Sequence, residues 1–136
     1  MFRAAGIVLA AAVAAPHGPP HLRIVAGTPQ SAVAYAEGNS RNYVAEFGPL
    51  EVAVGNVKNV AVRFTCVTRG CTFAPSDQPD TVTRVDPATY DVRAVNGKAE
   101  ISLTLSGPSP GPYTVLAYPN TARRHAGAVA FTLTAR

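Results

Sequence analysis

The chain has 136 residues, with 12 lysine and arginine residues against 8 aspartate and glutamate residues, which gives a formal net charge of +4 at pH 7. The cationic side chains are dispersed apart from one cluster, Arg123, Arg124 and His125, so the basic stripe interleaved with aromatics that nucleic-acid binding requires is missing. After the first 15 residues no stretch is apolar enough to cross a membrane.

Residues 1–15 combine a positive charge at Arg3, an apolar run and a small-residue site at Ala12-Val13-Ala14. This pattern is typical of a secretory signal peptide, and the run is shorter than the roughly 20 residues of a membrane-spanning helix. The alternative is an apolar tail on a cytosolic protein. We therefore expect a signal peptide, a proline-rich linker at 16–21 and a single domain at 22–136, with no stable membrane insertion once the leader is removed.

The remainder of the chain favours an all-β fold. It contains most of the 12 prolines and 11 glycines, and its apolar residues alternate with polar ones instead of recurring at helical spacing. In chain order we expect extended segments at 22–26, 31–36, 50–54, 60–66, 71–73, 81–85, 90–95, 98–105, 112–118 and 128–134.

Asn96-Gly97 is the strongest turn signal in the chain, because both residues of a two-residue hairpin loop take positive φ angles and Asn and Gly do so at low cost. A hairpin on this turn would bury one apolar face and set a register. The predicted cross-strand pairs are Val95–Lys98, Ala94–Ala99, Arg93–Glu100, Val92–Ile101 and Tyr90–Leu103.

Seven to nine short antiparallel strands, separated by turn signals about every 8–12 residues, fit an immunoglobulin-like β-sandwich. A small closed β-barrel is the competing architecture. Tyr113 heads a strand where a tyrosine-corner residue would sit, with its hydroxyl bonded back to the backbone. It is equally compatible with an ordinary strand aromatic.

Several segments, taken in order over about residues 22–135, resemble the bacterial immunoglobulin-like (Big, invasin/intimin-type) domain family. The matching segments are Gly27-Thr28-Pro29-Gln30-Ser31-Ala32, Pro49-Leu50-Glu51-Val52-Ala53-Val54, Val60-Ala61-Val62-Arg63-Phe64, Asn96-Gly97-Lys98-Ala99, Gly111-Pro112-Tyr113-Thr114-Val115-Leu116-Ala117 and Val129-Ala130-Phe131-Thr132-Leu133. The resemblance implies a bacterial β-sandwich that acts by binding. Such domains mostly occur in tandem within adhesins, whereas this chain holds one copy.

Cys66 and Cys71 are the only two cysteines. In an exported protein an even count favours a disulfide, here closing a small loop and contributing about 2 kcal/mol. Two buried thiols, or a metal or redox site, are the alternatives, although the spacing does not match the Cys-x-x-Cys redox motif.

Metal and catalytic chemistry find little support in the sequence. His17 and His21 lie in the linker, while Asp77, Asp80 and Asp86 lack calcium-loop spacing and suit turns better. The only methionine is Met1, which excludes a copper site built on Cys, His and Met. His125 stands without a nucleophile motif, so we expect no enzyme activity, no metal and no cofactor.

We therefore expect a secreted, periplasmic or cell-surface module that binds a protein or glycan through its loops, with a role in surface adhesion or host contact. The best candidate loop is 119–127, where Arg123, Arg124 and His125 could read an anionic group. The segment 66–80 is a second candidate. A solvated turn is the alternative for the arginine pair. Other functions compatible with the sequence are a soluble inhibitor or accessory subunit of an exported enzyme, and a structural spacer.

Overall fold

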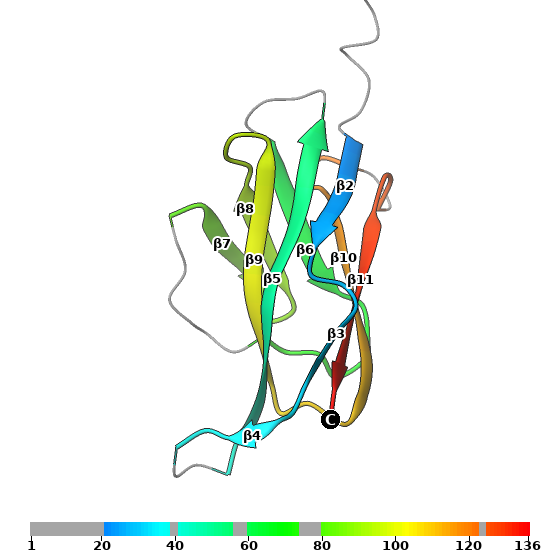
Figure 1. Cartoon of the computed structure of the whole chain (residues 1–136). Helices are drawn as coiled ribbons and strands as arrows, with labels where there is room; N and C mark the ends of the chain where they lie inside the picture. Colours follow the sequence, from blue (N-terminus) through cyan, green and yellow to red (C-terminus); the bar gives the residue numbers. More distant parts are fainter. Residues whose placement is uncertain (1–20, 39–40, 56–59, 74–79, 123–124) are drawn as a thin grey trace, which may run out of the picture.

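A computed structural model describes residues 21–38, 41–55, 60–73, 80–122 and 125–136 (Figure 1). The expected signal peptide and nearly all of the linker lie outside these residues. The described part contains ten strands and no helix: β2 (His21–Ala26), β3 (Gln30–Ala32), β4 (Tyr35–Ala36), β5 (Tyr43–Gly55), β6 (Ala61–Cys66), β7 (Val82–Asp86), β8 (Thr89–Arg93), β9 (Lys98–Ser106), β10 (Gly111–Pro119) and β11 (Val129–Ala135).

The strands form two sheets that pack face to face. One sheet has the order β3-β11-β10-β6-β8-β7, and in the other β9 pairs with one edge of β5 while β2 and β4 pair with the opposite edge. The β-sandwich is thus confirmed and the closed barrel is wrong, although the ten strands of the described part exceed the seven to nine expected. Two details differ from expectation: the segment 31–36 splits into two very short strands, and β3 pairs with β11 in parallel.

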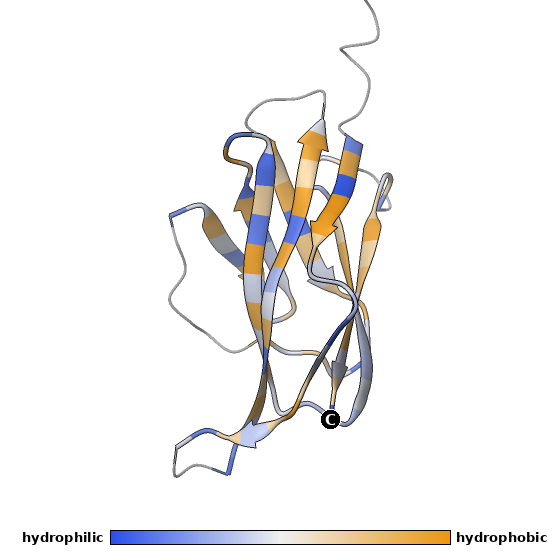
Figure 2. Cartoon of the chain, in the orientation of Figure 1, coloured by the Kyte–Doolittle hydropathy of each residue, from blue (hydrophilic) through white to orange (hydrophobic). Residues whose placement is uncertain are grey.

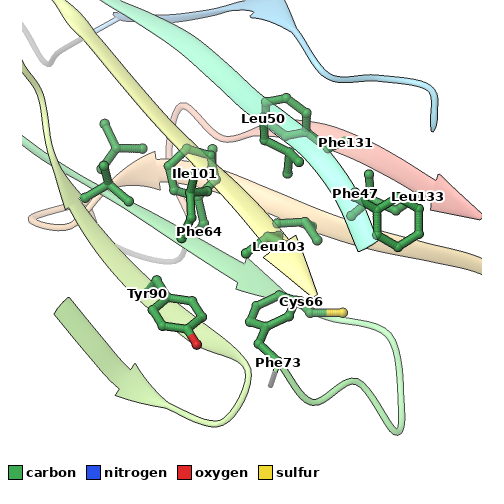
Figure 3. Packing of buried hydrophobic residues seen from close by; sticks show 14 of the residues in the cluster. Phe47, Leu50, Phe64, Cys66, Phe73, Tyr90, Ile101, Leu103, Phe131 and Leu133 are labelled. Atoms are coloured by element: carbon green, nitrogen blue, oxygen red, sulfur yellow. The ribbon is translucent and has the colours of Figure 1, made fainter. Parts of the chain in front are cut away.

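The core lies between the sheets and follows from the alternation in the sequence. Figure 2 shows hydrophobic and hydrophilic residues alternating along β5 and β9. The ring centroids of Phe64 and Phe131 lie 6.1 Å apart, and the ring of Phe73 stacks on that of Tyr90 with centroids 5.6 Å apart (Figure 3). Burial of each such side chain contributes roughly 1.5–3 kcal/mol before conformational entropy is subtracted.

The Asn96-Gly97 turn forms, but the hairpin register predicted beyond it is wrong. Asn96 and Gly97 have φ angles of 53° and 78°, and Val95 and Lys98 exchange backbone hydrogen bonds of 2.8 and 3.1 Å. From there the two arms separate. β8 pairs with β6 and β7, so Arg93 lies opposite Ala61, whereas β9 pairs with β5, so Glu100 lies opposite Glu51.

The arms separate because each pairs with strands of a different sheet. β9 pairs with β5 at eight positions, and β8 lies between β6 and β7 with a partner on each edge. The residues expected on the buried face are all buried, but they face each other across the sandwich instead of sharing one surface. They are Tyr90, Val92, Ala94, Ala99, Ile101 and Leu103.

A second crossing between the sheets occurs at Gly27, which links β2 in one sheet to β3 in the other. Its φ angle is 107°, and a Cβ placed there would lie 2.5 Å from the Pro49 carbonyl oxygen and 2.7 Å from the Leu50 Cα. The Gln30 amide donates to the carbonyls of Gly27 (2.7 Å) and Gly48 (3.1 Å). Residue 27 therefore has to be glycine, because any side chain would clash with the backbone of Pro49 and Leu50.

Two strand predictions also change. β5 begins at Tyr43, well before residue 50, because Gly48-Pro49 forms a bulge within one strand and does not end it. The segment 71–73 does not form a strand of its own. It contributes a single bridge between Phe73 and Leu105.

Candidate functional site

The described residues of the candidate loop 119–127 contact the six-stranded sheet. The His125 ring packs on the ring of Tyr118 with centroids 4.5 Å apart, and His125 has a φ angle of 61°. Asn120 donates its backbone N–H to Ala61 on β6 (3.0 Å). Arg123 and Arg124 lie outside the described residues. His125 is therefore tied to the sheet through Tyr118.

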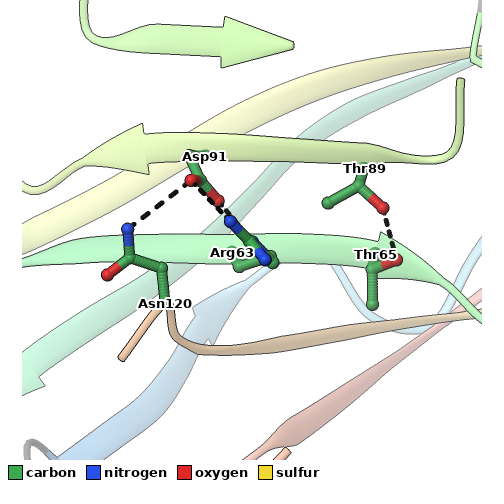
Figure 4. A network of polar contacts seen from close by, with 5 residues as sticks. All are labelled: Arg63, Thr65, Thr89, Asp91 and Asn120. Atoms are coloured by element: carbon green, nitrogen blue, oxygen red, sulfur yellow. Dashed lines mark hydrogen bonds and ion pairs between the residues drawn. The ribbon is translucent and has the colours of Figure 1, made fainter. Parts of the chain in front are cut away.

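The outer face of the same sheet carries a polar network (Figure 4). Arg63 donates to both carboxylate oxygens of Asp91, at 2.8 and 3.0 Å, and the Asn120 amide approaches Asp91 at 3.5 Å. The Thr65 and Thr89 hydroxyls are 2.7 Å apart on the same two strands.

Electrostatics around the network follow from these contacts. The hydrogen bonds to Asp91 raise the pKa of Arg63 above its ordinary value, and burial raises the pKa of the Tyr118 hydroxyl. Both planar groups of the ion pair are engaged with each other. This arrangement ties β6, β8 and the end of β10 together and leaves the guanidinium little capacity to bind an external anion.

The opposite end of the sandwich holds the cysteines and Tyr113. Cys66 and Cys71 form the predicted disulfide, with their Sγ atoms 2.15 Å apart. The Tyr113 hydroxyl accepts the Ser109 N–H (2.8 Å) and donates to the Ser109 carbonyl (3.2 Å), which is the contact expected of a tyrosine corner. A hollow of about 200 Å³ lies between these loops, with Arg69 on its rim. In the other candidate segment, residues 74–79 lie outside the described part.

A feature that the sequence did not indicate is a two-stranded ribbon formed by β4 and the start of β5, which projects beyond the end of the sandwich (Figure 1). Tyr35 lies opposite Val44, and Tyr43 lies opposite Ala36, so the two tyrosines occupy opposite faces of the ribbon. They are 45% and 53% exposed, and Val33 just before β4 is 62% exposed. We call these three side chains the apolar tip.

The apolar tip is held on an ordered backbone. The Glu37 N–H donates to the Asn42 carbonyl (3.0 Å), and the Gly107 N–H donates to the Tyr43 carbonyl (2.7 Å). The Tyr35 hydroxyl donates to the Glu46 carboxylate, and this hydrogen bond raises the pKa of Tyr35. Tyr35 is therefore oriented although it is exposed.

A second hollow, of about 320 Å³, opens where the edge of β9 faces the other sheet. Thr81, Val92, Arg93 and Val95 line it together with Glu51, Lys98 and Glu100, so two carboxylates and two cations surround it. Lys98 Nζ lies 3.1 Å from Glu51.

Within the described residues, no group of three or more His, Cys, Asp and Glu side chains is placed to hold a metal ion. His21 is the first residue of β2, and His17 lies outside the described part. A search of the same residues finds no helix with the length and apolar character needed to span a bilayer.

Comparison with protein-family models finds none that matches the chain, and comparison with curated proteins finds no similar one.

Proposed function

We propose that the chain is an exported immunoglobulin-like binding module that contacts a protein partner through the apolar tip. The observation that carries this proposal is the exposure of Tyr35 and Tyr43 on one projecting ribbon, with the exposed Val33 just before it. The centres of protein–protein interfaces are enriched in tyrosine and other aromatic residues, which supply much of the binding energy.

The ribbon geometry favours binding for a second reason. Both tyrosines sit on paired strand backbone, and the hydrogen bond to Glu46 orients Tyr35 before any partner arrives. Less side-chain entropy is then lost on association. Because the two rings lie on opposite faces, the ribbon suits insertion between two surfaces of a partner better than contact with a flat one.

Export is supported by the pattern of the first 15 residues and by the disulfide between Cys66 and Cys71, since disulfides persist in oxidising compartments. The resemblance to bacterial Big domains also supports a secreted, periplasmic or cell-surface location. In this proposal the sandwich is the scaffold, and the ribbon carries the contact.

The test is cross-linking in the source cells with the full chain, followed by mass spectrometry of the captured species. Tyr43→Ser should abolish capture without changing the melting temperature. Val85→Ser is the matched control, because Val85 is also an exposed apolar residue but lies on β7, away from the ribbon. Equal capture by both variants would refute a role of the tip. Capture of glycan alone would redirect the proposal to carbohydrate, and a single enzyme held at fixed stoichiometry would favour an inhibitor or accessory subunit.

A further inference from the structure

The Asn96-Gly97 turn connects the two sheets, since it leads from β8 in the six-stranded sheet to β9 in the other. Both residues are exposed, with φ angles of 53° and 78°. Val95 and Lys98 exchange backbone hydrogen bonds across the turn. The Gly97 carbonyl also accepts the Val54 N–H from β5 (2.8 Å). The turn is therefore held by its own closure and by a contact with a distant strand.

An asparagine that precedes a glycine can react with its own backbone. The Gly97 nitrogen attacks the side-chain carbonyl carbon of Asn96, Cγ, and forms a new N–Cγ bond. The side-chain nitrogen of Asn96 leaves as ammonia, taking up the proton of the Gly97 N–H, and a five-membered succinimide remains. Water then opens this ring at either carbonyl and gives aspartate or isoaspartate. Asn96 is the only asparagine in the chain that precedes a glycine, whose lack of a side chain leaves its nitrogen accessible.

The closed turn holds the two reacting atoms apart. Positive φ angles at both central residues, with reciprocal hydrogen bonds across them, define a type I′ turn. The ψ angle of the first central residue in this turn is about +30°, and there the Gly97 nitrogen lies on the opposite side of the Cα–C bond from the Asn96 Cβ. Ring closure requires both on the same side. The succinimide therefore forms only after rotation about this bond has moved Gly97 out of the turn.

The two products differ in their backbone. Aspartate keeps the original main chain and tolerates the positive φ angle that residue 96 adopts. In isoaspartate the main chain runs through the former side chain, so one extra carbon separates residue 96 from Gly97. A loop lengthened in this way cannot keep Val95 and Lys98 paired while the Gly97 carbonyl stays on the Val54 N–H. Isoaspartate therefore prevents the turn from closing again.

We propose that Asn96 is a site of spontaneous deamidation that the closed turn protects, and that its isoaspartate product keeps the connection between the two sheets open. The chain then carries a chemical clock, whose rate is set by how often this turn opens. The site lies on the connection between β8 and β9 and not on the apolar tip. The proposal therefore goes beyond the proposed function and does not depend on it.

The first test follows residue 96 by peptide mapping and mass spectrometry. The full chain is incubated at mildly alkaline pH, once folded and once unfolded in urea with the disulfide intact. Conversion should be at least about tenfold slower in the folded chain, because only its open fraction reacts. Equal rates in the two states would overturn the protection by the turn, and no conversion in urea would overturn the site.

Controls for this measurement lie in the same chain. Asn42 and Asn120 precede tyrosine and threonine, so both should convert more slowly than Asn96 in urea. Asn96→Gly is the matched variant, because two glycines also form a type I′ turn but offer no side-chain amide. It should melt close to the original chain and show no conversion at this position. Faster conversion of Asn42 or Asn120 than of Asn96 would contradict the assignment.

The effect of the product is tested on chains aged in urea and returned to buffer. Chromatography separates the aspartate and isoaspartate fractions, which carry the same charge and differ only in the backbone of residue 96. The isoaspartate fraction should melt lower, and its Val54 and Lys98 N–H groups should exchange with deuterated solvent at least about tenfold faster. Equal melting and equal exchange in the two fractions would overturn the claim that isoaspartate keeps the turn open.

Discussion

The outer faces of the two sheets arrange cross-strand charges in opposite ways. On the six-stranded sheet Arg63 lies opposite Asp91, and the two side chains form a bidentate ion pair that Asn120 extends. On the other sheet Glu51 lies opposite Glu100, with the single ammonium of Lys98 beside Glu51. The first face pairs its opposite charges directly, whereas the second places two carboxylates opposite each other, with Lys98 beside Glu51 and Arg93 lining the same hollow as Glu100.

The same contrast holds for the strand edges. β6 and β8 are each paired with a strand on both edges, whereas in the described part of the chain β9 pairs with the strand β5 and otherwise forms isolated bridges. A face whose hydrogen bonds and charges close within the molecule contributes stability. A face on which like charges lie opposite each other contributes less.

The largest loss of folding stability is expected when the Asp91 carboxylate is removed. Asp91→Ala leaves the half-buried Arg63 guanidinium without its carboxylate, so the free energy of unfolding should fall by about 1–2 kcal/mol, the range for a partly exposed charged hydrogen bond. Urea unfolding measures the change. Glu100→Ala is the matched variant and should shift stability by less than about 0.5 kcal/mol. Equal losses in the two variants would remove the contrast between the faces.

A smaller loss is expected at Thr89, which is buried with its hydroxyl 2.7 Å from that of Thr65. Thr89→Val keeps the shape and removes the partner of Thr65, so stability should fall by about 1 kcal/mol. Thr83→Val on the exposed edge strand β7 is the control and should be close to neutral. Thermal unfolding at neutral pH measures both, and a neutral Thr89→Val would show that the hydroxyl pair contributes nothing.

A third effect is confined to alkaline pH. Burial raises the pKa of Tyr118 above its ordinary value of 10.0, so the folded state holds this proton more tightly than the unfolded state. The resulting stability is fully present below pH 10 and is lost as pH rises through the raised pKa. Tyr118→Phe should therefore flatten the decline in melting temperature above pH 10. A decline as steep as that of the original chain would contradict the assignment.

The smallest effect tests the like-charged face directly. Glu100→Gln removes the like-charge pair with Glu51 and should raise stability by about 0.2–0.5 kcal/mol at low salt, with the gain shrinking as salt screens the repulsion. Denaturant midpoints at two salt concentrations measure it. A loss of stability on this substitution would mean that Glu100 is already neutralised within the molecule.

Local patterns sufficed to predict much of the fold. Alternation identified the buried faces around Tyr90 and Ile101, and the Asn96-Gly97 pair located its turn, because both signals depend only on neighbouring residues. The register beyond the turn depends on which distant strands the two arms pair with. The local sequence does not indicate that β9 pairs with β5 instead of with β8.

The sites were harder to predict for the same reason. Gly48-Pro49 has the composition of a turn but forms a bulge where the chain crosses at Gly27, a contact between segments far apart in sequence. Tyr35 and Tyr43 flank a polar stretch that predicts a loop. Their exposure follows from the projection of the ribbon beyond the sheets, which no periodicity encodes. Arg123 and Arg124 lie outside the described residues, so their proposed role stays a prediction.

The parallel pairing of β3 with β11 bears on how the domain would respond to mechanical tension. The start of β2 and the C-terminal end lie at opposite ends of the sandwich (Figure 1), so a pull between Leu22 and Ala135 would run along the strands. The hydrogen bonds joining β3 to β11 lie across that direction and would be sheared together instead of being unzipped singly. We expect this shear geometry to resist a pull along the strands better than a geometry in which the hydrogen bonds open one at a time.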